Sequence, residues 1–236
     1  MKSLSKKGSG HFEMIIAFTL FVGFTFFLFM MLDPQDDSSL FGSVIIGVEN
    51  NFNEITSVSL GQVFLKVNYT RNESCFYLDF PSDIFVLNFN NPGSLVFDLS
   101  GNEVDSIFAG GKLSIESGEE FFRVSISEEF DNDVLGSCDV ADSYDVGVAL
   151  ERKVISYSKL VEMKDKYFAD YEGLREDLKV PGIFDFAIVP QNFPEVVMLP
   201  VTGIPDSVDV LSEEKVFDIL NENGTLISER ISFRIW

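Results

Sequence analysis

Few residues in this chain have the type and spacing that catalysis or metal binding requires. Its 236 residues include one histidine, His11, so no histidine-based triad or metal site can form elsewhere. There is also no G-x-S-x-G motif, no glycine-rich phosphate loop and no C-x-x-C pair. We therefore predict a non-enzymatic protein without catalytic residues, metal or cofactor. An alternative is a hydrolase with a carboxylate pair, since acidic residues are plentiful, but no pair stands out.

Acidic residues gather in two places where their oxygens would suit a hard cation such as Ca²⁺. The two clusters are Glu128, Glu129, Asp131 and Asp133, and Asp139, Asp142 and Asp145. Neither has the spacing of an EF-hand loop. Because 38 residues of the chain are Asp or Glu, such clusters are expected, and we interpret both as solvated surface.

The two cysteines, Cys75 and Cys138, are candidates for a disulfide. An oxidising exterior would permit the bond, and closing a loop of about 60 residues would stabilise the fold by roughly 4 kcal/mol. The alternative is two separate core cysteines, because spacing alone does not show that their Cα atoms are close.

Three Asn-x-Ser/Thr sequons make Asn68, Asn72 and Asn223 candidate glycosylation sites on an exported domain. Asn223 is the best placed, at a predicted hairpin tip.

The residues from Met14 to Leu32 are uncharged and almost entirely apolar. Nineteen residues at about 1.5 Å each match the ~30 Å hydrocarbon core, so we predict a transmembrane helix at residues 11–32. Lysines precede it and aspartates follow it, which places the N-terminus in the cytoplasm. A cleaved signal peptide is the rival interpretation, but no small-residue cleavage site follows the run.

The segment Lys6-Lys7-Gly8-Ser9-Gly10-His11-Phe12-Glu13 before this run resembles the leader of type IV pilin-like proteins, including their archaeal relatives. The resemblance covers about the first 32 residues. It implies cleavage after Gly8, a retained helix that serves as anchor and filament core, and Glu13 as a charge that pairs with the new N-terminal amine of a neighbouring subunit. The alternative is an uncleaved anchor with Glu13 at the membrane edge.

The remaining chain predicts short strands separated by turn residues, which is typical of an antiparallel sandwich or barrel. Between residues 158 and 178, apolar side chains recur at three- and four-residue steps, as on one face of an amphipathic helix. Asn221-Glu-Asn-Gly224 predicts a hairpin turn before an alternating C-terminal strand. The expected strands are residues 62–69, 75–80, 84–89, 94–99, 112–116, 120–126, 184–189, 216–220 and 226–236.

The predicted fold class is α+β and mostly β: one N-terminal transmembrane helix, then an antiparallel β-sandwich-like ectodomain with one amphipathic helix. The predicted parts are a cytoplasmic basic leader (1–10), the transmembrane helix (11–32), a linker (33–39), an extracytoplasmic β-rich domain (40–150), and a helix with a C-terminal β-hairpin packed on that domain (151–236). Leu40 to Val48 either extends the stalk or begins the first strand.

These features predict a single-pass, pilin-like cell-surface protein with its C-terminal domain outside the cell. Its partners would be the lipid bilayer and, through the helix, further copies or other pilin-like subunits. Nucleic acid is not an expected partner, because the formal net charge of −21 repels phosphates. The alternative function is a monomeric, membrane-anchored binding or adhesion module.

Overall fold

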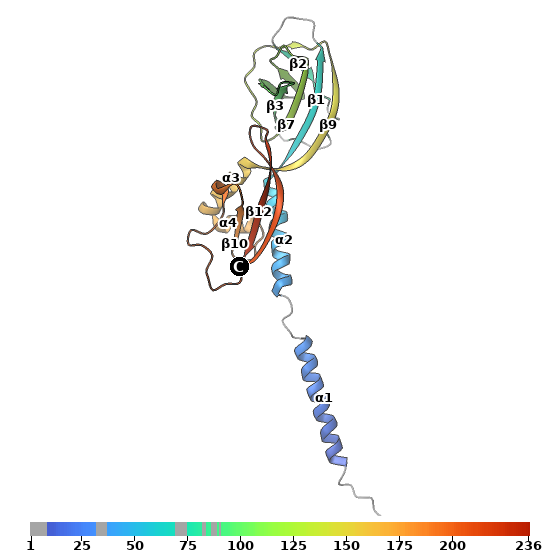
Figure 1. The fold of residues 1–236 in the computed structure, drawn as a ribbon, viewed down its shortest axis with the longest axis vertical. Coiled ribbons are helices and arrows are strands. Elements are labelled where there is room, and N and C mark those ends of the chain that lie inside the picture. The colour runs from blue at the N-terminus through green and yellow to red at the C-terminus, as the bar shows by residue number, and fades with distance from the viewer. Residues whose placement is uncertain (1–8, 32–36, 69–74, 82–83, 86–88, 90) are drawn as a thin grey trace, which may run out of the picture. The chain divides into compact units, whose positions relative to one another are not determined.

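The computed structural model describes residues 9–31, 37–68, 75–81, 84–85, 89 and 91–236 (Figure 1). The chain divides into two compact units, Met1–Ser43 and Val44–Trp236. The first unit holds helix α1 (Ser9–Met31) and the start of helix α2 (Asp37–Thr56). The second holds all the strands and the remaining helices.

Helix α2 shows that the apolar stretch from Leu40 to Val48 continues as a helix and does not begin a strand. Ile45, Val48 and Phe52 lie three and four residues apart, share one face and are buried. The Phe52 ring meets the edge of Phe233 with 5.2 Å between ring centroids. The buried Glu49 carboxylate forms an ion pair with Lys215. These contacts attach α2 to the C-terminal hairpin.

The larger sheet has eight strands in the order β10-β12-β11-β9-β1-β7-β3-β4. Its central pair is formed by β1 and β9, the two longest of the described strands, which are antiparallel and run side by side (Figure 1). The strands of this sheet are β1 (Ser57–Asn68), β3 (Gly93–Asp98), β4 (Glu103–Val104), β7 (Phe121–Ser127), β9 (Ser143–Ser156), β10 (Phe186–Pro190), β11 (Leu211–Leu220) and β12 (Leu226–Ile235).

The smaller sheet has four strands in the order β5-β6-β2-β8 and shares a core with one half of the larger sheet. Alternate residues of β1, such as Leu65, and of β7, such as Val124, meet Leu78 and Ile115 from the small sheet in one buried cluster. This part of the chain is therefore built as two packed β-layers. The strands of the smaller sheet are β2 (Phe76–Asp79), β5 (Ser106–Ala109), β6 (Lys112–Ile115) and β8 (Asp139–Val140).

Two strand pairs correct the prediction of an antiparallel sandwich, because β9 pairs with β11 and β2 pairs with β8 in parallel. The β9–β11 contact is short and joins Ile155 to Ile219 and Ser156 to Leu220. It connects the C-terminal hairpin to the long central strand, so the eight strands form one continuous sheet. In addition, β9 runs without a break across residue 150, where the sequence suggested a boundary.

Instead of the single helix predicted at residues 158–178, the structure has α3 (Tyr157–Ala169) and α4 (Tyr171–Asp177). Asp170 separates them with a non-helical backbone, and its carboxylate accepts a hydrogen bond from the Gly173 N–H at 3.1 Å. Aspartate is a favoured N-cap because it satisfies amides that the new helix leaves unpaired. A short 3₁₀ helix, η1 (Pro194–Val196), completes the helical elements.

The C-terminal hairpin agrees with the sequence pattern. β11 and β12 pair from Leu211↔Ile235 to Leu220↔Leu226. The turn needs Gly224, because its φ of +75° lies in the left-handed region that favours glycine. By contrast, Ile84, Phe85 and Phe89 are not in a strand, and the other residues of the strand predicted at 84–89 lie outside the described part of the chain.

The predicted membrane-spanning segment requires correction. A helix that crosses a bilayer needs about 20 consecutive, predominantly apolar residues. Among the residues that the structure describes, no helix combines the length and the apolarity needed to cross a membrane. The structure thus does not support the transmembrane helix predicted at 11–32. The same correction applies to the single-pass topology, the cytoplasmic N-terminus and the extracellular, cell-surface location that were inferred from it.

Cys75 and Cys138 are joined by a disulfide, with 4.8 Å between their Cα atoms and 63 residues of sequence separation. Cys75 directly precedes β2, and Cys138 directly precedes β8. The bond therefore lies at the start of a parallel strand pair that consists of two residue pairs only, Phe76↔Asp139 and Tyr77↔Val140.

We expect the double variant Cys75→Ser, Cys138→Ser to lower the free energy of unfolding by about 4 kcal/mol, because the unfolded chain regains the entropy of a long loop. Guanidinium unfolding followed by far-UV circular dichroism measures this difference. A reductant should shift the wild-type curve onto that of the variant and leave the variant unchanged. Coincident curves for variant and oxidised wild type would contradict the expectation.

Candidate functional site

Three aromatic rings from consecutive elements form the centre of the candidate site. Tyr167 of α3 meets Phe186 of β10 edge to face at 5.5 Å, and Tyr171 of α4 stacks on the same ring at 5.2 Å with 14° between planes. Tyr167 and Tyr171 also meet edge to face, at 5.2 Å. The helix break at Asp170 allows two tyrosines only four residues apart to hold Phe186 from two directions.

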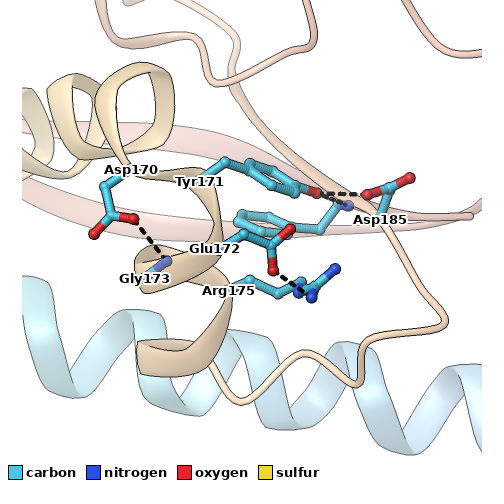
Figure 2. Close-up of polar contacts among 7 residues, drawn as sticks. Asp170, Tyr171, Glu172, Gly173, Arg175 and Asp185 are labelled. Atoms are coloured by element: carbon cyan, nitrogen blue, oxygen red, sulfur yellow. Dashed lines mark hydrogen bonds and ion pairs between the residues drawn. The ribbon is translucent and has the colours of Figure 1, made fainter.

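Hydrogen bonds tie both tyrosine hydroxyls to β10 or to the residue before it. Tyr167 donates to the Phe186 carbonyl at 3.0 Å. The Tyr171 hydroxyl donates to Oδ1 of Asp185 at 3.0 Å and accepts from the Phe186 N–H at 3.1 Å (Figure 2). Both hydroxyls therefore help to fix the position of the strand relative to α3 and α4.

Burial raises the pKa of both phenols. The pKa of Tyr167 lies well above its ordinary value of 10.0, first because of desolvation and then because of Tyr171 and Asp185. For Tyr171, desolvation and the Asp185 carboxylate raise the pKa to about 12, although the Phe186 N–H and Arg175 oppose the shift. Both residues are therefore neutral hydrogen-bond donors at neutral pH.

A cavity of about 350 Å³ opens beside these tyrosines. Asp185 and Trp236 meet there although they are 51 positions apart, because β10 pairs with β12 in the register Phe186↔Ile235. Their backbones exchange two hydrogen bonds, of 2.9 and 3.1 Å. The segment that contains Pro200 and Pro205 forms the rest of the wall. The cavity is thus lined by an aromatic cluster and one carboxylate side chain.

This site was not predicted from the sequence. Trp236 is the only tryptophan of the chain and ends the alternating strand predicted at residues 226–236. Asp185 precedes an apolar run and has no distinguishing spacing. Their proximity depends on the pairing of β10 with β12, which a single sequence does not reveal.

The residues singled out for assembly and glycosylation lie elsewhere. Glu13 is in the first turns of α1, while Gly8 and Asn72 lie outside the described residues. Asn68 ends β1 and donates a hydrogen bond to the Ser143 hydroxyl at 3.2 Å. Asn223 is exposed at the β11–β12 turn, where its side-chain oxygen accepts from the Thr225 N–H at 3.0 Å. The roles proposed for these residues remain predictions.

The first acidic cluster is not simply solvated surface, because the Glu129 side chain is buried. Its carboxylate accepts hydrogen bonds from the Ser158 N–H at 3.0 Å, the Ser158 hydroxyl at 2.9 Å and the Ser156 hydroxyl. Ser156 in turn accepts from the Lys159 N–H and is the N-cap of α3. Glu129 therefore supports the start of this helix, where a negative charge is favourable.

Within the described ranges, no group of three or more His, Cys, Asp or Glu side chains is arranged to hold a metal ion. No protein-family model matches the chain, and no curated protein or solved structure shows significant similarity to it. The resemblance of the N-terminal segment to pilin-like proteins therefore remains an interpretation of its residues.

We expect Glu129→Ala to lower the free energy of unfolding by about 2 kcal/mol, because it leaves buried hydrogen-bond donors at the start of α3 without an acceptor. Glu116→Ala is the matched control, since Glu116 is exposed and its loss should change stability by no more than about 0.5 kcal/mol. Urea denaturation of the two variants measures both values. Equal effects would contradict a capping role for Glu129.

The raised tyrosine pKa values predict a loss of stability in strong alkali. The folded state holds the Tyr171 proton up to about pH 12, whereas the unfolded chain releases it near pH 10, so stability should fall as pH rises between these values. The variant Tyr171→Phe should show a shallower fall over this window. Thermal unfolding at a series of pH values, with Tyr77→Phe as the control, measures the difference. Identical slopes for Tyr171→Phe and wild type would contradict the prediction.

Proposed function

We propose that the chain is a non-enzymatic, pilin-like assembly subunit, in which α1 packs against the α1 helices of other subunits and the β-rich unit is the exposed head. The observation that carries this proposal is the surface of α1. Its described side chains are almost all apolar and exposed in the isolated chain. Eight of them have exposed fractions between 57 and 69%: Met14, Ile15, Phe18, Leu20, Phe21, Phe24, Phe26 and Phe27.

These side chains surround the helix. An α-helix turns by about 100° per residue, so Phe18 and Leu20 lie about 160° apart and Phe26 projects in a third direction. The helix therefore has no polar face that could remain in water. A helix that is apolar all round is stable only when it is buried. One flat docking surface would cover part of it, whereas several neighbouring helices would cover it all.

The polar groups of α1 support the same conclusion. Thr19 donates its hydroxyl hydrogen to the Ile15 carbonyl at 2.8 Å, and Thr25 donates to the Phe21 carbonyl at 2.7 Å. These bonds satisfy the hydroxyls within the helix, so they can be buried without loss of a hydrogen bond to water. Glu13 is the only Asp, Glu, Lys or Arg between Ser9 and Met31, which places this charge at one end of the packing surface.

The acidic head fits a subunit that is held by its helix. From Val44 to Trp236 the chain has 34 acidic and 14 basic residues, a formal net charge of −20. Heads of this charge repel one another over roughly 10 Å at moderate salt. Attraction between subunits must therefore come from the apolar helix, while repulsion keeps the heads apart and accessible.

To test this proposal, we would introduce Phe18→Glu and Leu20→Glu separately and cross-link the full chain in mild detergent. Each change should lower the yield of oligomers about tenfold or more, because a buried unpaired carboxylate disfavours helix packing from either side. Val134→Glu is the matched control, since Val134 is 98% exposed in the β-rich unit. This variant should assemble like wild type.

Because Phe18 and Leu20 lie on opposite sides of α1, the two variants distinguish a helix bundle from docking on a single face. Loss of oligomers in both variants supports packing around the whole helix. Loss in only one variant indicates docking on a single face and contradicts the proposed bundle. Wild-type yields in both variants, or a monomeric wild type, would contradict helix-mediated assembly altogether.

A further inference from the structure

The cavity beside α3 and α4 is lined mainly by aromatic and apolar residues, together with one carboxylate side chain. Four of its lining residues are aromatic: Tyr167, Phe168, Tyr171 and Trp236. Asp185 is the only residue with a charged side chain among those that line it. At about 350 Å³ the cavity falls at the lower end of the range for small-molecule sites.

The Asp185 carboxylate has one oxygen that can accept a hydrogen bond from a ligand or pair with its charge. Its Oδ1 atom accepts from Tyr171, whereas Oδ2 accepts no hydrogen bond from the described part of the chain. Arg175 lies near enough to Tyr171 to lower the pKa of that phenol, but it forms an ion pair with Glu172 (Figure 2). Arg175 does not line the cavity. The negative charge at the wall is therefore not neutralised by a lining cation.

The aromatic rings provide a ligand with apolar contact area, whereas their hydroxyls provide few further hydrogen bonds. Both tyrosine hydroxyls are already bonded at β10, and Phe186 covers one face of the Tyr171 ring without lining the cavity. Apart from them, the lining side chains with hydrogen-bonding oxygens are Asp185 and Thr202. A sugar would leave most of its hydroxyls without partners here. A bare divalent metal would find too few oxygen ligands.

We propose that this cavity binds a small organic ammonium ion whose nitrogen carries alkyl groups. The π-faces of the aromatic residues attract the cationic head, and its methyl or methylene groups replace water against the rings. The Asp185 carboxylate supplies a counter-charge from a side chain. This inference concerns the head of the protein and is independent of how α1 assembles.

Choline and its neutral isostere 3,3-dimethylbutan-1-ol provide the direct test, since they differ chiefly in charge. Isothermal titration of the full chain in mild detergent gives the two affinities. Fluorescence of Trp236, the only tryptophan, reports binding at the cavity itself. We expect saturable choline binding with a Kd of about 1 mM or below. The neutral alcohol should bind at least about tenfold more weakly.

The variant Asp185→Asn removes the charge but keeps an oxygen that can accept from Tyr171, so the fold should be preserved. It should weaken choline binding about tenfold or more. Asp209→Asn is the matched control, because Asp209 is exposed and does not line the cavity. Its affinity should equal that of wild type.

Three results would overturn the proposal. The first is no heat and no change in fluorescence at 20 mM choline, about twenty times the expected Kd. The second is equal affinity for choline and the neutral alcohol, which would show that the cavity selects shape and not charge. The third is unchanged choline affinity in Asp185→Asn. Binding of glucose in place of choline would assign the cavity to sugars and would also overturn it.

Discussion

The carboxylate of Glu129 is buried where β7 ends, β9 ends and α3 begins, and the positions of the later elements depend on it. A buried carboxylate costs several kcal/mol in lost hydration unless it is fully hydrogen-bonded. Here two serine hydroxyls and the Ser158 amide supply the bonds, and the positive end of the helix supplies a favourable field. The interaction thus fixes the direction in which the chain leaves the sheet. Tyr167 and Tyr171 follow on that helix and the next, so the walls of the cavity depend on the same junction.

The two units differ in whether their apolar side chains are buried within the chain. In the β-rich unit, alternate strand residues such as Leu65, Leu78 and Val124 are buried between two sheets, and the disulfide closes a segment that has only short strands. In helix α1, by contrast, most of the described side chains are apolar and exposed, and the hydroxyls of Thr19 and Thr25 bond back to the helix. The first unit is therefore incomplete as an isolated chain, whereas the second has its own core. This contrast favours an assembly subunit over a monomeric binding module.

Local patterns predicted the elements that are stabilised locally. The Asn221–Gly224 turn and the strands around Leu78, Val96 and Val124 have clear turn residues or alternation, and the structure contains them. β9 was missed because most of its side chains are exposed, so no apolar periodicity marks it. The predicted helix is divided at Asp170 by one capping hydrogen bond. The apolar pattern of the sequence continues through this position, so it does not reveal the division. The site itself arises from the register of β10 and β12, which is set by tertiary pairing and not by local sequence.

The pairing of β10 with β12 also positions the groups that the proposed ligand would contact. β10 is the last strand of its sheet, and on its outer side Ile188 exchanges two backbone hydrogen bonds with Met198. The backbones of Asp185 and Trp236 hold each other through two hydrogen bonds, which fixes a carboxylate beside an indole without using either side chain. The Tyr171 hydroxyl then orients the Asp185 carboxylate by donating to its Oδ1 atom, and Oδ2 stays available to a ligand. Because the rigid backbone and a neutral phenol do the positioning, the charge and the aromatic surface stay available. Such preorganisation reduces the entropy lost on binding, which is what a shallow site needs to hold a small ion.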